Sequence, residues 1–228
     1  MRRLPWARTV FWLYVATLML PLLWMFGMSI RPNDEILGSF SLLPLGTARK
    51  VFMAKGYGEA TVADIVEDSG ISVGSLYHHF GGKPGLFLAL WEQFMRNQEE
   101  RTAKAAKAVG GTTERFLAGA RAYLEGSWEQ RDVARLFLES DGPAEFTTLR
   151  RQRGWDWIGG NKKLLGLADN RQSHMLVVLL TTVMGESGRE VAACESEEEA
   201  RVTIDAVIAV VRRMLSTAPD VAPASSEG

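Results

Sequence analysis

The chain has 228 residues, and its 26 Lys and Arg residues are matched by 27 Asp and Glu residues, for a formal net charge of −1. This balance excludes the strongly basic footprint that drives non-specific binding to nucleic acids. A single cysteine, Cys194, excludes an internal disulfide framework and a zinc site with several thiolates, and no loop of the type G-x-x-x-x-G-K-[ST] is present. We therefore predict that the chain is not an enzyme and has no metal or cofactor site.

The first predicted element is an apolar leader, residues 1–44. Residues 9–30 contain no charged side chain and are long enough to cross a bilayer as one helix. Arg2, Arg3 and Arg8 precede this segment, so the positive-inside rule places the N-terminus in the cytoplasm and the following residues across the membrane. The leader therefore predicts a single transmembrane-like helix.

The leader, residues 1–44 and especially 21–44 (PLLWMFGMSIRPNDEILGSFSLLP), is similar to the start of a binding-protein-dependent ABC sugar transporter permease. The chain supplies none of the further membrane spans of such a permease, so no transport function follows. Pro44 and Gly46 disfavour a continuing helix, and we expect a foreign leader to join the next domain there and to shorten its first helix. That helix keeps three apolar residues to cover the back of the next motif: Ala48, Val51 and Phe52.

Two short helical patterns joined by a glycine turn follow in residues 61–80 (TVADIVEDSGISVGSLYHHF). Thr61 is a suitable N-cap for the first helix, and Gly70 suits the left-handed conformation that ends it. Ser72 caps the second helix, residues 73–79, which is too short to fill a core. Two helices joined by a tight turn are typical of a helix-turn-helix motif, in which the second helix enters the major groove of DNA.

The wider stretch, residues 46–92, resembles the DNA-binding domain of TetR/AcrR-type transcriptional regulators, above all in ARKVFMAKGYGEATVADIVEDSGISVGSLYHHFGGKPGLFLALWE. The resemblance implies a three-helix domain over residues 45–92 in a repressor-like dimer that binds a palindromic operator. It also implies which residues contact DNA. These are Thr61 for a phosphate, Val73, Gly74 and Ser75 for base edges, Tyr77, His78 and His79 on the exposed side, and Lys83 as a phosphate clamp.

Residues 93–217 predict a second, all-α domain for ligand binding and dimerisation. Residues 175–184 (MLVVLLTTVM) are apolar nearly all round, and such a helix has to be covered on both sides. One cover is the chain's own core. The other is the same helix of a second copy, as the family resemblance also implies, and a wholly internal core is the alternative. The helical patterns cover residues 83–107, 113–126, 128–139, 143–165, 170–193 and 197–216.

Aromatic side chains are concentrated in this second domain. We expect most of them to fill the core and some to line a small-molecule cavity. If the family mechanism holds, an unknown ligand bound there moves the long helix over residues 83–107 and releases the DNA. The candidate lining residues are Phe116, Tyr123, Trp128, Phe137, Phe146, Trp155, Trp157 and Met175.

The sequence as a whole predicts a cytoplasmic, ligand-responsive transcriptional regulator, an all-α homodimer that binds double-stranded DNA as a repressor. Two alternatives stay open: a regulator tethered to the inner membrane through residues 9–30, and a non-functional fusion with a permease fragment. The tethered form conflicts with the charge bias, which puts the helix-turn-helix on the side of the membrane without an operator. The tail, residues 218–228, is predicted to be disordered.

Overall fold

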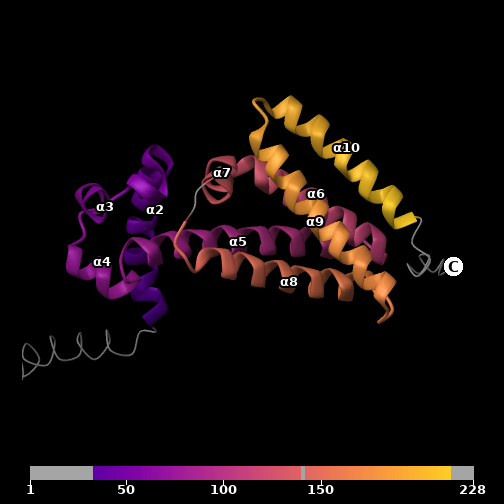
Figure 1. Ribbon diagram of the computed structural model, residues 1–228, viewed down its shortest axis with the longest axis horizontal. Helices are drawn as coiled ribbons and strands as arrows, with labels where there is room; N and C mark the ends of the chain where they lie inside the picture. The colour runs from indigo at the N-terminus through magenta and orange to yellow at the C-terminus, as the bar shows by residue number, and fades with distance from the viewer. Residues whose placement is uncertain (1–32, 140–141, 217–228) are drawn as a thin grey trace, which may run out of the picture. The chain divides into compact units, whose positions relative to one another are not determined.

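The computed structural model describes residues 33–139 and 142–216, and every regular element in these ranges is a helix (Figure 1). The predicted all-α class is confirmed for these residues, whereas the apolar segment 9–30 and the tail 218–228 lie outside them. Within the described ranges, no helix combines the length and the apolar character that a membrane span needs. The helices are α2 (Asn33–Glu59), α3 (Val62–Ser69), α4 (Val73–Phe80), α5 (Lys83–Lys107), α6 (Thr112–Glu129), α7 (Arg131–Glu139), α8 (Phe146–Leu165), α9 (Arg171–Ala193) and α10 (Glu197–Ser216).

The chain divides into two units, Met1–Leu43 and Pro44–Gly228, and the packing described below belongs to the second. The prediction that Pro44 and Gly46 shorten the first helix is wrong, because α2 runs through both residues. Proline fixes φ near the helical value and removes one N–H donor, so a helix passes through it with the loss of one backbone hydrogen bond. The break in α2 comes at Gly56, whose φ of 73° and ψ of 169° are not helical. The three residues predicted to cover the back of the motif are all buried: Ala48, Val51 and Phe52.

The other helices follow the predicted segments closely. Helices α5 and α10 have the predicted bounds. Helix α6 continues to Glu129, three residues past the predicted end at residue 126, so α7 begins at Arg131 and not at Trp128. Helix α8 begins at Phe146, three residues after Pro143. The differences lie at helix ends, where periodicity gives the weakest signal.

An aromatic core joins α2, α3, α4 and the start of α5 to α7 and the start of α8. Phe87 of α5 lies completely buried at its centre, and its ring meets those of Phe137 and Phe146 edge to face, with centroid distances of 5.2 and 5.0 Å. Edge-to-face contacts are favoured by the charge distribution of aromatic rings. The buried members of this aromatic core are Leu45, Ala48, Val51, Phe52, Ala60, Ile65, Leu76, Leu86, Phe87, Leu90, Trp91, Val133, Leu136, Phe137 and Phe146.

A second, mainly aliphatic core is built by α6, α9 and α10 with the end of α8 and the residue that follows its C-cap. Helix α9 contributes Val177 and Leu180 and α10 contributes Val211, all completely buried. The other buried members of this aliphatic core are Phe116, Leu117, Ala120, Leu124, Leu165, Leu167, Met184, Val191, Cys194, Ala200, Ile204, Ile208 and Leu215.

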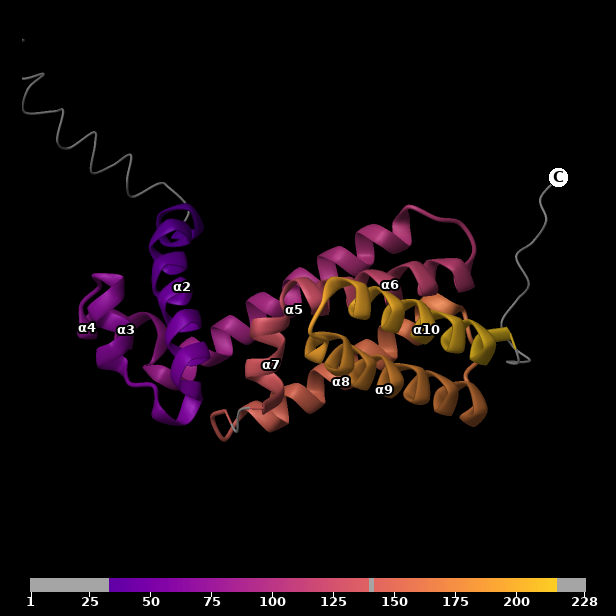
Figure 2. The same cartoon turned by 90° about the horizontal axis from the view of Figure 1, so that it is seen from above.

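Helix α5 belongs to both regions of the molecule. Its first turns bury Leu86, Phe87 and Leu90 in the aromatic core, and its second half packs along α6 as far as Lys107. Figures 1 and 2 show α5 extending from α4 into the bundle formed by α6, α8 and α9. One uninterrupted helix therefore connects the helix-turn-helix to the rest of the chain.

Candidate nucleic-acid interface and cavity

Helix α3 begins with a reciprocal cap. Thr61 Oγ1 accepts the Asp64 N–H at 3.2 Å and Asp64 Oδ2 accepts the Thr61 N–H at 3.0 Å, which satisfies two backbone donors. Lys55 Nζ donates to Asp64 Oδ1 at 2.8 Å. The hydrogen bonds from Lys55 and from Thr61 lower the pKa of Asp64 to about 2. The predicted N-cap at Thr61 is confirmed, and its hydroxyl proton remains available for donation to a phosphate.

The turn between α3 and α4 depends on a glycine. Gly70 has a φ of 69°, and its N–H bonds to the Val66 carbonyl oxygen at 3.2 Å. Because L side chains disfavour this left-handed conformation, glycine ends α3 with the least strain. Ser72 Oγ accepts the Ser75 N–H at 3.1 Å and so caps α4. Leu76 of α4 is completely buried, so α4 is held against the core along one face.

The other faces of α4 carry the side chains predicted to contact DNA. Val73 and Tyr77 are each about half exposed, although residues of this size usually pack inside. The rings of His78 and His79 meet edge to face at a centroid distance of 5.0 Å. The structure thus brings six predicted contact residues together on one exposed or half-buried helical surface: Val73, Gly74, Ser75, Tyr77, His78 and His79.

Lys83, in the first turn of α5, is partly engaged within the chain. Its ammonium donates to the carbonyl oxygens of Tyr57 at 2.8 Å and of Gly58 at 3.2 Å, and it stands 4.5 Å from the centroid of the Tyr57 ring. An ammonium has three donors, so one direction remains for a phosphate while the two carbonyls fix its position. No side chain of the described residues caps the N-terminus of α5 at Gly82. The phosphate contact at Lys83 stays a prediction that this geometry permits.

Helices α4 and α5 approach each other so closely that glycine is required at their junction. A Cβ at Gly85 would lie 1.6 Å from the carbonyl oxygen of Phe80. A Cβ at Gly82, whose φ is 105°, would lie 3.0 Å from the Tyr77 ring. A larger residue at Gly85 requires movement of the backbone, whereas one at Gly82 requires a shift of the Tyr77 ring and a strained φ. The orientation of α4 is therefore fixed to that of α5.

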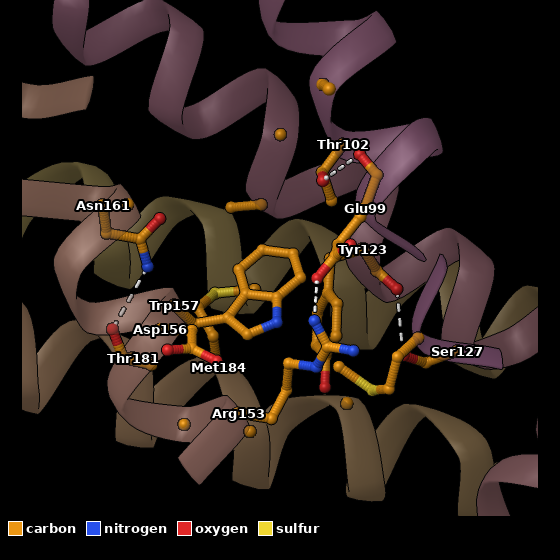
Figure 3. A pocket seen from close by; sticks show the side chains of 18 of the residues that line it. Glu99, Thr102, Tyr123, Ser127, Arg153, Asp156, Trp157, Asn161, Thr181 and Met184 are labelled. Carbon is orange, nitrogen blue, oxygen red and sulfur yellow. Dashed lines mark hydrogen bonds and ion pairs between the residues drawn. The ribbon is translucent and has the colours of Figure 1, made fainter. Parts of the chain in front are cut away.

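A cavity of about 750 Å³ lies among α5, α6, α8 and α9, with α7 contributing part of its wall (Figure 3). This volume falls within the range of small-molecule sites, roughly 300–1,000 Å³. The walls come from helices far apart in the sequence, so the cavity exists only in the folded chain. Its largest apolar side chains are Trp91, Phe94, Phe116, Tyr123, Phe137 and Trp157.

The sequence-based candidates for the cavity divide into two groups. Phe116, Tyr123, Phe137 and Trp157 line it. Trp155, by contrast, is 53% exposed and stacks on the His174 ring at a centroid distance of 6.4 Å. Trp155 and Trp157 are separated by about 200° around α8, so only one of them faces inward.

The remaining three candidates, Trp128, Phe146 and Met175, are not part of the cavity wall. Trp128 packs against the aliphatic core with the Arg131 guanidinium 4.1 Å from its ring centroid. Phe146 is buried in the aromatic core, and Met175 lies on the outer surface of α9. Aromatic content alone does not show which side chains border a void.

The polar groups of the cavity were not predicted. Arg153 Nη1 of α8 donates to Glu99 Oε1 of α5 at 2.8 Å, and its guanidinium lies 5.8 Å from the centroid of the Trp91 ring. Asn161 Nδ2 donates to Thr181 Oγ1 at 3.1 Å. The signal in the sequence was a charged or amide residue at a position that helical periodicity places on the inward face of a helix.

Two further groups shape the chemistry of the cavity. Burial raises the pKa of Tyr123, so its phenol is neutral at physiological pH. The indole Nε1 of Trp157 is buried and has no hydrogen-bond partner among the described residues. An indole nitrogen only donates, so this site can be satisfied by an acceptor atom.

Helices α9 and α10 each expose two large apolar side chains. Met175 and Leu179 of α9 are 46% and 52% exposed, and Val202 and Val210 of α10 are 55% and 51% exposed. The opposite faces of both helices are buried in the aliphatic core. The segment predicted to be apolar all round is thus covered by the chain on one side only.

Residues 45–90 match the model of the family "Bacterial regulatory proteins, tetR family". The transcriptional repressor AcnR of Corynebacterium jeikeium is 42% identical over 73 residues, which cover 32% of this chain and 39% of AcnR. The transcriptional activator FasR of Mycolicibacterium smegmatis is 27% identical over 110 residues, or 48% of each protein. The matches thus span less than half the length of these relatives.

The fold of the whole described region also has solved counterparts. The TetR family regulator CifR, solved in complex with 26-bp double-strand operator DNA, superposes with a TM-score of 0.55 at 20% identity, and the shared region covers 77% of this chain and 95% of CifR. This likeness concerns the fold. Residues 45–90, which hold α3, α4 and the start of α5, are thus similar to the corresponding region of tetR-family transcriptional regulators.

Proposed function

We propose that the chain is a ligand-responsive repressor that binds a palindromic operator as a homodimer and is released by a small molecule. The observation that carries this proposal is the continuity of α5. Its N-terminus is locked to α4 at Gly82 and Gly85, and its second half forms a wall of the cavity. A change at the cavity therefore has a direct structural route to the helix-turn-helix.

In this proposal α4 lies in the major groove of DNA. The Ser75 hydroxyl, near the start of α4, both donates and accepts and can meet several base edges. Tyr77 and the two histidines donate to phosphate oxygens, which fixes the position of the helix on the duplex. Thr61 and Lys83 supply the flanking phosphate contacts.

Dimerisation is needed because one protomer offers little binding energy. Helix α4 has eight residues, and the chain as a whole has a net charge of −1, so non-specific attraction to DNA is weak. Two copies of α4 presented together bind half-sites about one helical turn apart. The outer face of α9 and α10 is the surface that we assign to the second copy, because it exposes Leu179 and Val210 while the inner face is buried.

The repressor mode is favoured by the relatives. AcnR is named a repressor and matches this chain at 42% identity, whereas the activator FasR matches at 27%. In the repressor mode, a ligand that binds better to the DNA-free arrangement shifts the population away from the operator. The shift acts through α5.

The decisive test is selection of binding sites from random double-stranded DNA by the purified full chain in detergent. We expect a palindromic site, and loss of the selected site by the Tyr77→Ala variant with unchanged thermal unfolding. A matched variant, Leu179→Glu, places a charge on the outer face of α9 and should give a folded monomer that no longer selects the palindrome. The proposal is contradicted if neither the full chain nor the chain that lacks residues 1–43 selects any sequence.

The leader enters the same experiment as a second comparison. Residues 9–30 lie outside the described residues, so membrane tethering and a foreign leader both stay predictions. A chain that lacks residues 1–43 retains the whole of the second unit. If only this shorter chain selects a palindrome, the leader is foreign to the regulator, and cell fractionation of the full chain separates the tethered form from the cytoplasmic one.

A further inference from the structure

We propose that the cavity binds a carboxylic acid with an apolar body, and that Trp157 and Arg153 donate hydrogen bonds to its carboxylate. This inference rests on the proposed function, because it names the chemical class of the effector. It also assigns the mechanism by which the effector reaches α5.

The first observation is the unpartnered indole N–H of Trp157. This nitrogen is buried, the Trp157 side chain lines the cavity, and no described residue accepts the proton of the indole N–H. A buried donor without a partner is unfavourable, so a ligand that brings an acceptor oxygen gains affinity there. Figure 3 shows the indole nitrogen on the side of the ring that faces the Arg153 guanidinium. Both side chains belong to the wall of the same cavity.

The second observation is the charge of the cavity wall. Two of its carboxylates are already paired, Glu99 with Arg153 at 2.8 Å and Glu186 with Arg189 at 3.2 Å. The wall as a whole holds more cations than anions, which favours an anionic ligand over a cationic one. Its cations are Lys107, Arg115, Arg150, Arg153 and Arg189, and its anions are Glu99, Asp156 and Glu186.

The third observation is the apolar remainder of the wall. Rings of Trp91, Phe94, Phe116 and Phe137 surround most of the space, so the body of the ligand has to be apolar. A planar carboxylate suits this setting, because its oxygens accept from a guanidinium fork and from an indole N–H at once. Phosphate esters carry more charge and require a larger polar surface than these two donors provide.

The bound carboxylate competes with Glu99 for Arg153. The Glu99–Arg153 pair is the ion pair that joins α5 to α8 among the described residues. A guanidinium that turns toward a ligand weakens its hold on Glu99 and hence on α5. The ligand thereby loosens the helix that carries α4, which explains how an anion in the cavity releases DNA.

Calorimetric titration of the full chain in detergent, without DNA, tests the ligand class directly. The probes are straight-chain carboxylic acids of about eight to about sixteen carbons, a range of sizes for a cavity of this volume, each with its methyl ester and its primary amine. We expect one chain length to bind best as the acid, about tenfold more tightly than the ester, with no binding of the amine. Equal binding of all three, or preference for the amine, overturns the proposal.

Three variants sharpen the result. Trp157→Phe removes the N–H and keeps a ring, and should weaken the acid about tenfold. Trp155→Phe is the matched control two residues away on the outer face of α8, and should leave the affinity unchanged. Glu99→Gln tests the sign of the ligand charge. It removes the carboxylate that competes for Arg153, so the acid should bind to this variant several-fold more tightly. A weaker acid complex in Glu99→Gln contradicts the inference.

The two levels of the proposal fail separately. If the chain selects an operator but binds no acid, the ligand class is wrong and the regulator stands. If the acid binds with the expected effects of the variants but no DNA is selected, the ligand class stands and the regulator is wrong. If both hold, adding the acid should displace the operator from the wild-type chain and not from Trp157→Phe at the same concentration.

Discussion

The aromatic core and the region around the cavity contain similar aromatic residues but pack them differently. Around Phe87, four aromatic rings lie at centroid distances of 4.9–5.9 Å. Around the cavity, Phe116 and Trp157 leave about 750 Å³ between them and the other helices. Dense packing fixes the geometry of a DNA-binding surface, whereas the same residue types held apart make a binding site. In our proposal, function depends in the first region on the fixed orientation of α4 and in the second on the volume of the cavity.

The largest expected effect tests the junction that joins the two regions. Gly85→Ala places a methyl group against the Phe80 carbonyl oxygen, and we expect it to lower the free energy of unfolding by more than about 4 kcal/mol. Gly46→Ala is the control, because a Cβ there meets open space within a helix and should stabilise by about 0.5–1 kcal/mol. Chemical denaturation measures both. A wild-type stability for Gly85→Ala would contradict the close approach of α4 and α5.

A pair of truncations compares the two regions directly. Phe87→Ala removes the central ring of the aromatic core and should cost about 4 kcal/mol, within the usual range for buried phenylalanine. Phe116→Ala enlarges a wall that already borders empty space, and we expect about 2 kcal/mol because fewer contacts are lost. Urea unfolding of both variants checks the difference. Equal costs would show that the cavity is closed in solution.

A smaller effect is expected at the cap of α3. Thr61→Ala removes the acceptor of the Asp64 N–H and should lower the free energy of unfolding by about 1 kcal/mol. Thr61→Ser keeps the acceptor and should match the wild type within the error of a thermal melt. If serine behaves like alanine, the methyl group and not the cap is responsible.

The smallest effect is a pH dependence at the same cap. The pKa of Asp64 is lowered to about 2 from an ordinary value of 3.8, so its stabilising effect is present above pH 3.8 and is lost as the pH falls through about 2. The melting temperature of Asp64→Asn should therefore lie below that of the wild type at about pH 5 and approach it toward about pH 2. A difference that grows as the pH falls has the wrong sign for this mechanism.

The helix-turn-helix was predictable because its signals are local. Thr61, Gly70 and Ser72 specify where helices begin and end within a stretch of consecutive residues, and the structure places each of them at the expected cap or turn. The continuation of α2 through Pro44 was missed, because proline in a helix interior costs about 3 kcal/mol and was therefore expected to end the helix.

The cavity was only partly predictable because its walls meet in three dimensions. The phase of α8 separates Trp157 from Trp155, but the sequence did not show which of them faces the interior until α9 was in place. The pairing of Glu99 with Arg153 joins residues on different helices. No local pattern encodes the space between helices, so a void is visible only after packing.

The length of α5 determines how far one of its ends moves when the other end tilts. At about 1.5 Å per residue, its 25 residues make a rod about 37 Å long. A tilt of about 5° at one end moves the other end by about 3 Å. That displacement is close to the 3.4 Å rise of one base pair, so in the proposed function a small shift of the cavity wall by a ligand is enough to move α4 out of register with the DNA by about one step.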